Sequence, residues 1–597
     1  MDRLLQYYEN ELDYMRRAFD AFARTHPQAA RTLAVTAGKS ADPDIQRLSD
    51  SLALIASRLN QRMDDAVPEI ALDLLRLICP MFLLGSPSYC PIKLEKSDAL
   101  AGQVVVRKGT ELDFLTGEGR SLCRYTSAAT VKIAPLSAHN FHVQTAPFPF
   151  DTPNESDGFE AALSLTIAPH DPDSSFADLK VDSLPLYINA PPGRKQRILN
   201  VLAGGIHGIS LSENNSGFAH WFGPEALKFT FARSDDTYLP SSGIPASGFE
   251  ALRDFIAYPD QAYFFEIDNL GDILAQMPAG TITLRIFVDA SAAKALEDVH
   301  SEDLAINVVP LINTYSDTTR PLRYNYQRVQ VPLLPNSADQ MDVVSLQISG
   351  IDQLTSEGNV SLPSMTDPTR RQESETPVWQ ERHAHGEFNL ARLSVSFSIP
   401  HCHKQGKRDI PDEMDIVAKV LCSNGEAGTR PKPGAKCDFQ DDALAGIPFS
   451  LVAEPTTAIL PDCHADQQWE VLSLLNANFS TLFEAKDPKS SLVEALRICA
   501  PNHVREAGDA VWDVKVNQRV APMQVDGSML LAAGSEIEVT LDKSKLPIAS
   551  HAFAMALNRF IGCFVSFDRF FQLIVRERGH VQPLRVFPRT HGMALGG

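Results

Sequence analysis

Soft metal-ligating side chains gather within one stretch of the chain. Its members are His383, His385, His401, Cys402, His403, Cys437, Cys463 and His464. Histidine and cysteine are preferred ligands of zinc, and an H-x-H pair can supply two ligands from one strand. Structural zinc sites, however, normally use short paired spacings such as C-x2-C, which place two ligands on one tight turn. No such spacing occurs here, so we predict polar loop histidines, with no bound metal or other cofactor.

A second chemical motif is Gly38-Lys39-Ser40, which resembles the end of a phosphate-binding loop. In that loop, backbone N–H groups surround the phosphates and the lysine neutralises their charge. The full motif also requires a glycine five residues before Gly38, where this chain has Leu33. We therefore predict a capping turn between two helices and no nucleotide site.

The known signatures of catalysis are missing from the sequence. There is no G-x-S-x-G elbow, no H-E-x-x-H helix and no G-x-G-x-x-G loop. Adjacent carboxylates such as Asp64-Asp65 arise by chance among 74 acidic residues, and nothing in the sequence pairs them with a substrate pocket. We predict no catalytic residue. The alternative is an enzyme, such as a cytoplasmic hydrolase with an unrecognised site in the middle of the chain.

The composition is that of a multidomain globular protein. The chain has 597 residues, of which 44% are hydrophobic and 21% are charged, and this length predicts about three or four domains. A formal net charge of -20, with no long basic run, disfavours nucleic-acid binding. The N-terminus is charged and no apolar run approaches the ~20 residues of a membrane span. We expect a cytoplasmic protein that does not insert into a membrane, with its nine cysteines reduced and buried.

The first 90 residues have the periodicity of helices that pack along one another. A helix over residues 1–26 and a second helix that begins at Pro43, capped by Asp42, each repeat apolar residues in alternating steps of three and four. A third helix is predicted from Pro68. The predicted seam consists of Leu5, Tyr8, Leu12, Met15, Phe19 and Phe22 in the first helix and Ile45, Leu48, Leu52, Ile55 and Leu59 in the second. Either the two halves of this seam pack on each other, or both helices join a bundle with other chains.

Beyond the helical module of residues 1–90, short runs of β-branched and aromatic residues predict strands. We expect an α+β multidomain fold, with an N-terminal helical bundle segment, β-rich middle domains of mostly antiparallel sheet at 91–300 and 301–460, and a mixed helix and strand domain at 461–597. Residues 354–386 and 423–441 are poor in apolar side chains. These two segments are predicted to be mobile loops, because they bury too little apolar surface to offset the entropy of ordering.

A series of blocks, in order from end to end, resembles the TssF family, also called VasA or ImpG. The blocks include LLQYYENELDYMRRAF, ADPDIQRLSDSLALIASRLNQRMDDAVPEIALDLLRLICPMFL, PSYCPIKLE, VVRKGTELDF, FEALRDFIAYPDQAYFFEI, VVPLINTYSDTTRPLRYNYQRVQVPLLP, VLCSNGEAG, WEVLSLLNANFSTL, FVSFDRFFQLIV and FPRTHGMAL. Each block is a structural pattern without chemistry, and their specificity lies in their order. The chain departs from the family at the two predicted loops and at Val586-Phe587, where a tryptophan is expected.

The resemblance implies a structural subunit of the baseplate wedge of a contractile type VI secretion system, similar to a tailed-phage baseplate wedge protein. Such a subunit scaffolds the assembly of sheath and tube and the delivery of effectors, without catalysis. The implied partners are a second copy of the chain and TssG in the wedge, TssK trimers, TssE and the central spike VgrG. The implied location is the inner face of the cytoplasmic membrane, reached through other subunits. A third class of function is an effector adaptor or chaperone outside the assembly.

Overall fold

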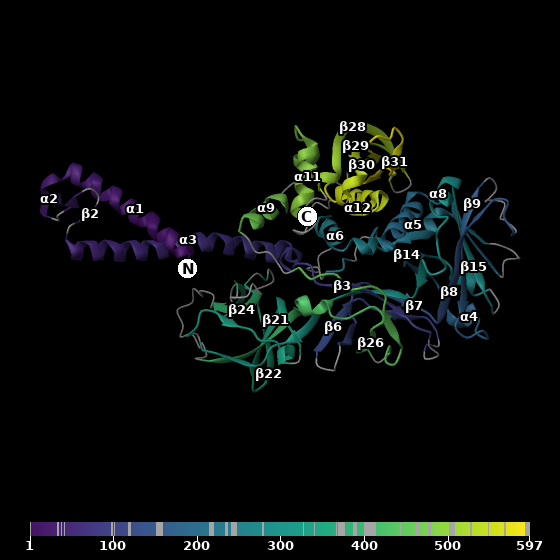
Figure 1. The fold of residues 1–597 in the computed structure, drawn as a ribbon, viewed down its shortest axis with the longest axis horizontal. Helices are drawn as coiled ribbons and strands as arrows, with labels where there is room; N and C mark the ends of the chain where they lie inside the picture. Colours follow the sequence, from purple (N-terminus) through teal and green to yellow (C-terminus); the bar gives the residue numbers. More distant parts are fainter. Residues whose placement is uncertain are drawn as a thin grey trace. The chain divides into compact units, whose positions relative to one another are not determined.

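The computed structural model of the chain falls into two compact units, drawn in Figure 1. Unit 1 comprises Met1–Ile78 and Cys463–Leu472, and unit 2 comprises Cys79–Asp462 and Ser473–Gly597. The structure describes residues 2–591 except 33–34, 37–38, 41, 97–99, 101, 117–120, 151–158, 214–219, 233–236, 240–247, 277–279, 326, 340, 366, 368–376, 386–390, 399–412, 442, 460–464, 476–478, 501–507, 526–527, 547 and 566–568. Helices and mostly antiparallel sheets confirm the predicted α+β fold class.

Unit 1 contains a helical hairpin in which α1 (Asp2–Thr25) lies alongside α3 (Pro43–Ile78) (Figure 1). Between them lie α2 (Pro27–Thr32) and a ribbon of β1 (Val35–Thr36) and β2 (Lys39–Ser40). The predicted cap is confirmed, because Asp42 Oδ1 accepts the N–H of Asp44 at 2.9 Å. The predicted helix start at Pro68 is wrong, since α3 runs through Pro68 as one helix of 36 residues. The helical spacing of apolar residues continues on both sides of this proline. The loss of the one backbone hydrogen bond that proline removes therefore does not end the helix.

Unit 2 is built around a closed barrel, which leaves no free strand edge. In barrel order its strands are β17 (Val308–Ile312), β3 (Tyr89–Leu94), β27 (Phe449–Leu451), β26 (Lys436–Phe439), β5 (Glu111–Thr116) and β6 (Ser121–Ser127). Alternate side chains of these strands, such as Phe114, Tyr125 and Phe449, fill the interior. A short ribbon of β4 (Val104–Val106) and β7 (Val131–Ile133) completes this region.

The chain between β6 and β17 forms two further antiparallel sheets with helices. One sheet has the order β12 (His220–Phe222), β11 (Gly208–Glu213), β15 (Ile282–Val288), β9 (Ala161–Pro169) and β8 (Leu136–Thr145). The other has the order β13 (Leu227–Phe229), β14 (Phe264–Ile267), β10 (Leu184–Ile188) and β16 (Leu304–Ile306). The helices are α4 (Phe176–Leu179), α5 (Pro192–Gly204), α6 (Gly248–Ala257), α7 (Gly271–Leu274) and α8 (Ala290–Ala295).

The chain between β17 and β26 forms a sandwich of two sheets around one apolar core. The first sheet contains β18 (Tyr315–Thr318), β25 (Met414–Ser423), β21 (Val344–Thr355), β22 (Gly358–Leu362) and β19 (Leu322–Tyr324). The second contains β20 (Val331–Pro332), β24 (Ala391–Ser398) and β23 (Val378–His385). The barrel therefore takes strands from both middle segments, 91–300 and 301–460, and the sandwich interrupts it.

Both predictions of mobile loops need correction. Within 354–386, the hairpin of β21 and β22 and most of β23 are regular strands, whereas 366, 368–376 and 386 lie outside the described residues. Within 423–441, a 3-10 helix (Gly425–Thr429) is followed by barrel strand β26. These segments are polar, but they are ordered by hydrogen bonds to distant strands, which composition does not reveal.

The last part of unit 2 is a mixed helix and sheet domain, as predicted for the C-terminal region. Its sheet has the order β28 (Val511–Val525), β29 (Ser528–Leu541), β30 (Phe570–Glu577) and β31 (Pro583–Val586), with β32 (Thr590–His591) on β30. Strands β29 and β30 are parallel, and α12 (Ser550–Gly562) connects them. Two helices, α10 (Phe479–Phe483) and α11 (Pro488–Cys499), precede the sheet, and α9 (Ala465–Leu475) leads into them.

Candidate interaction surfaces

The α1 half of the predicted seam packs on α3, but on a face of α3 that sequence periodicity did not single out. Ser49 Oγ lies 3.6 Å from Met15 Sδ. Ala53 and Ser57, four and eight residues further along α3, are fully buried. These small side chains share one face of α3, because residues four apart lie one above the other. Met15 of α1 therefore contacts the face of α3 on which these small side chains lie.

The structure separates the two halves of the predicted seam. In α1, Tyr8, Leu12, Met15, Phe19 and Phe22 are half-buried. In α3, by contrast, Leu48, Leu52 and Ile55 remain 62%, 48% and 65% exposed. Leu5, Ile45 and Leu59 belong to these helices, but their side chains lie outside the described residues. Among the described side chains, Leu48, Leu52 and Ile55 are therefore left largely uncovered by α1.

Five of the exposed apolar residues of α3 lie on one side of the helix. At 100° per residue, Leu48, Leu52, Ile55, Ile70 and Leu77 fall on one side, and all five are exposed. We call these five residues the outer stripe. Sequence periodicity identified the first three as helix contacts, and the predicted third helix contained the other two. An exposed apolar stripe of this kind is typical of a binding face for another helix.

In unit 2, the family-like block FEALRDFIAYPDQAYFFEI forms a buried junction. Helix α6 buries Glu250, Arg253 and Asp254, although charged residues are seldom fully buried. The guanidinium of Arg253 lies 4.6 Å from the centre of the Phe82 ring, and its Nη1 donates to the carbonyl of Cys499 at 3.3 Å. One helix thus joins the start of unit 2 to its C-terminal part.

A carboxylate of the same helix organises the chain around it. Asp254 accepts the backbone N–H groups of Tyr238 at 2.9 Å and Leu239 at 3.0 Å. Burial raises the pKa of Asp254 to about 6, although the hydrogen bonds from these two N–H groups oppose that shift. Its geometry is that of a structural carboxylate, because Tyr238, Leu239 and Gln261, which donate to it, are neighbouring parts of the same fold.

The block VLCSNGEAG joins the barrel to the sandwich through buried amides. Asn313 Nδ2 donates to the carbonyl of Arg124 at 2.7 Å and to Asn424 Oδ1 at 2.9 Å. Asn313 Oδ1 accepts from Ser423 Oγ and from the Asn424 N–H, each at 2.8 Å. A Cβ at Gly428 would lie 2.9 Å from Asn313 Oδ1, so only glycine fits there without a shift. The glycines and polar residues of this block thus serve close packing.

The residues that suggested metal or nucleotide chemistry belong to different elements where they are described. His383 and His385 are on strand β23, not in a loop, and their side chains lie outside the described residues. Cys437 faces the barrel core, where burial raises the pKa of its thiol to about 12. His401, Cys402, His403, Cys463 and His464 lie outside the described residues. Lys39 is in strand β2, opposite Thr36.

The cysteines in the described part of the chain behave as small apolar residues. Six of them, Cys79, Cys90, Cys123, Cys422, Cys437 and Cys499, are buried, and Cys563 is half-buried. All seven are free thiols. Burial as predicted is confirmed at the first six of these positions, whereas Cys563 is partly exposed.

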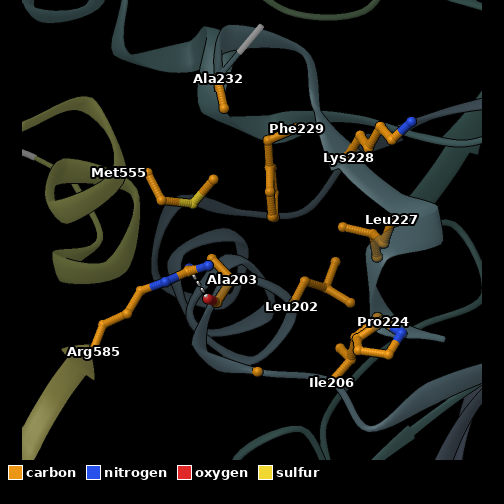
Figure 2. Close-up of a pocket in the computed structure, with 11 residues that line it drawn as sticks. Leu202, Ala203, Ile206, Pro224, Leu227, Lys228, Phe229, Ala232, Met555 and Arg585 are labelled. Carbon is orange, nitrogen blue, oxygen red and sulfur yellow. Dashed lines mark hydrogen bonds between the residues drawn. The ribbon is translucent and has the colours of Figure 1, made fainter. Parts of the chain in front are cut away.

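A cavity of about 340 Å³ lies between the C-terminal domain and α5. Figure 2 shows Met555 and Arg585 facing Ala203 and Phe229 across it. Arg585 Nη1 donates to the carbonyl of Ala203 at 2.6 Å, and this hydrogen bond joins the C-terminal domain to α5. Among the described residues, the walls of the cavity are mainly apolar and include Lys228 and Arg585 but no carboxylate.

The exposed outer stripe and the closely joined domains of unit 2 are typical of a structural subunit that assembles with other chains. The sequence matches the family described as type VI secretion system, TssF, over residues 1–594. The chain belongs to the TssF family, the baseplate subunits of the type VI secretion system.

Individual relatives agree with this assignment. The chain is similar to the type VI secretion system component TssF1 of Pseudomonas aeruginosa, with 21% identity over 98% of each chain. Its fold is similar to a chain of a TssK-TssF-TssG baseplate subcomplex, with a TM-score of 0.73, 18% identity, and 93% of this chain and 100% of that chain covered. A chain in a structure of the type VI secretion system baseplate complex gives a TM-score of 0.56 at 18% identity, with 98% of this chain and 99% of that chain covered. In the described part of this chain, no helix is long and apolar enough to cross a membrane.

Proposed function

We propose that this chain is a scaffolding subunit of the baseplate wedge and acts by binding other subunits, without catalysis. The observation that carries the proposal is the family match over residues 1–594. The fold shared with a chain of a TssK-TssF-TssG subcomplex supports TssG and TssK as partners. In this role the chain holds its partners in place for assembly of the sheath and tube and for effector delivery.

The helical hairpin of unit 1 is the part that we propose to bind in the wedge. Its outer stripe leaves Leu48, Leu52 and Ile55 about half or more exposed. Burying such side chains against a partner helix is favourable by roughly 1.5 to 3 kcal/mol for a full side chain. A second copy of the chain together with TssG would complete a bundle around this stripe.

Further contacts are proposed from the same family role. TssE and the central spike VgrG would meet the wedge as it assembles. The assembly would lie at the inner face of the cytoplasmic membrane, where other subunits dock it. No catalytic residue, metal or nucleotide is required in this proposal.

Copurification tests the proposal. The full chain is coexpressed with TssG and TssK, and the complex is purified through a tag on TssG. We expect the chain to copurify at a fixed stoichiometry and to be more soluble than when expressed alone, because its exposed faces become buried. A monodisperse, stable monomer that ignores TssG would contradict the proposed function.

A further inference from the structure

Strand β28 forms a long edge of the C-terminal sheet. It runs for 15 residues, whereas strands most often have about five or six. Figure 1 shows it at the outer end of the sheet. Among the described residues, β29 is the only strand that pairs with it. The outer side of β28 therefore presents N–H and C=O groups that a strand from another chain can bind.

The middle of this edge is supported by the rest of the sheet. A bulge at Trp512 precedes it, and regular pairing with β29 begins at Asp513. The residues of β29 that lie opposite Asp513 to Arg519 are Gly534–Thr540, and these also pair with β30. We call residues 513–519 the edge segment. Because two further strands lie behind it, the edge segment is held in the extended shape that another strand requires.

The side chains of the edge segment separate onto two faces. Alternate residues of a strand point to the same face. Val514 and Val516 share one face, on which Val514 is buried and Val516 is half-buried. The opposite face carries the polar residues Asp513, Lys515, Asn517 and Arg519.

The charges of the polar face are only weakly paired within the chain. Lys515 Nζ lies 3.7 Å from Asp513, and Arg519 Nε lies 3.7 Å from Glu536. The side chains of Asp513 and Arg519 are 45% and 59% exposed. Exposed ion pairs of this kind contribute little to stability, so both side chains can turn to a partner on the outer side of β28.

The order of these side chains is complementary to itself. When the edge segment pairs antiparallel with a second copy about Val516, Asp513 lies opposite Arg519 of the second copy, and the reverse pair follows by symmetry. Lys515 lies opposite Asn517, and the two Val516 side chains meet at the centre. Opposite charges directly across two strands are favourable. The edge segment therefore fits an isologous interface, in which the same surface is used by both copies.

The registers next to this one do not fit. Pairing about Lys515 would place the Lys515 side chains of the two copies directly opposite each other. Pairing about Asn517 would place Lys515 opposite Arg519 twice. Like charges directly opposite destabilise a strand pair. Pairing about Val514 would bring the bulge next to the centre, so the register about Val516 is the one that charge and regular geometry both favour.

We propose that the edge segment pairs with the edge segment of a second copy of this chain and joins the two sheets into one. Each residue pair adds about one backbone hydrogen bond, and the two Asp513–Arg519 pairs set the register. This inference rests on the proposed function for the presence of a second copy, and it adds a contact through unit 2 to the one proposed for the helical hairpin.

Cysteine cross-linking of the full chain, coexpressed with TssG and TssK, tests the proposal. Val516→Cys places the two thiols at the centre of the interface, where opposite Cβ atoms are about 4.5 to 5.5 Å apart and within reach of a disulfide. We expect a covalent dimer of the chain on a non-reducing gel after mild oxidation. The matched control is Val520→Cys, 71% exposed on the same strand. In the proposed register the two Val520 residues lie about 27 Å apart, so this variant should remain monomeric on the gel, as should wild type.

Charge reversal tests the register in the Val516→Cys background. Asp513→Arg places like charges opposite each other and should lower the yield of the covalent dimer about tenfold. Adding Arg519→Asp restores opposite charges in exchanged positions and should restore the yield, which would not happen if the first variant were merely misfolded. Equal yields with and without Asp513→Arg would contradict the proposed register.

Two outcomes separate this proposal from the proposed function. If the chain binds TssG but Val516→Cys gives no more dimer than Val520→Cys, the edge segment does not bind a second copy and the scaffold role stands. Protection of the Val516→Cys thiol from an alkylating reagent in that complex would then assign the edge to a different chain. If Val516→Cys links copies of the chain but the chain does not bind TssG, the edge pairing stands and the proposed function is wrong.

Discussion

Replacing Leu48, Leu52 and Ile55 by glutamine should prevent assembly while leaving the isolated chain folded. These side chains are 62%, 48% and 65% exposed, so removing them from α3 costs the isolated chain little. Glutamine keeps the helix, because its helical propensity is close to that of leucine. The effect should therefore appear only when a partner helix covers the outer stripe.

The expected loss of binding free energy follows from the fraction of each side chain that is exposed in the isolated chain. Burying a whole leucine or isoleucine side chain contributes about 1.5 to 3 kcal/mol. Scaled by the exposed fractions, the three residues together should contribute about 3 to 5 kcal/mol to binding. That is a loss of affinity of about a hundredfold to several thousandfold. The assay is the dissociation constant of the purified chain for the TssG complex.

The matched control is Leu54→Gln, on the same helix. Leu54 is 41% exposed but is turned away from the outer stripe by more than a third of a helical turn. This variant should bind as wild type does. If the triple variant also binds as wild type does, the outer stripe is not a binding face. If the triple variant unfolds the isolated chain, the stripe is needed for the fold instead.

Three further outcomes test the packing on which the interpretation depends. Ala53→Leu places a large side chain in the buried face between α1 and α3 and should destabilise unit 1 by about 1 to 3 kcal/mol in chemical denaturation. Gly428→Ala should destabilise unit 2 by a similar amount, because its Cβ would lie 2.9 Å from Asn313 Oδ1, whereas Gly350→Ala, with open space around it, should not. In the folded chain the pKa of Asp254 is about 6, whereas the ordinary value is 3.8, so protonation of this carboxyl favours folding. Asp254 therefore contributes about 3 kcal/mol to the free energy of unfolding at low pH, and this contribution is lost as pH rises from about 4 to above 6. Asp254→Asn should flatten this part of the stability profile, and an unchanged profile would show that Asp254 does not cause it.

Local signals in the sequence predicted the helices of unit 1 well. Asp42 and Pro43 mark the start of α3, and the cap that they predict is present. The face of α3 that contacts α1 could not be predicted from apolar spacing. Large side chains such as Met15 pack best against small ones, and Ser49, Ala53 and Ser57 carry no apolar signal that would identify them.

The arrangement of unit 2 was harder to predict, because its contacts are distant in the sequence. Strand β3 pairs with β17 and β27, more than two hundred residues away. Asn424 lies in a segment that was predicted to be a mobile loop, yet it is buried and bonded to Asn313. Amino-acid composition indicates which side chains are polar. It does not identify the distant residue that replaces water as the hydrogen-bond partner of a buried side chain.

The resemblance to the TssF family predicted the function more surely than any single motif. Its blocks include FEALRDFIAYPDQAYFFEI and VLCSNGEAG, and in the structure these blocks form the buried junctions of unit 2. A cleft of unit 2 that is lined by Asp182, Glu266, Asp268 and Asp272 was not foreseen, since these carboxylates come from separate loops and strands. Only the fold brings them together.

The mass of the coexpressed complex shows whether this chain is a subunit of the wedge. The chain is produced together with TssG and TssK, purified through TssG, and measured by native mass spectrometry. We predict one defined complex that contains two copies of this chain for each TssG, and the triple variant of the outer stripe should be absent from it. A chain that is recovered only as a free monomer beside an intact complex of the other two subunits would contradict the account.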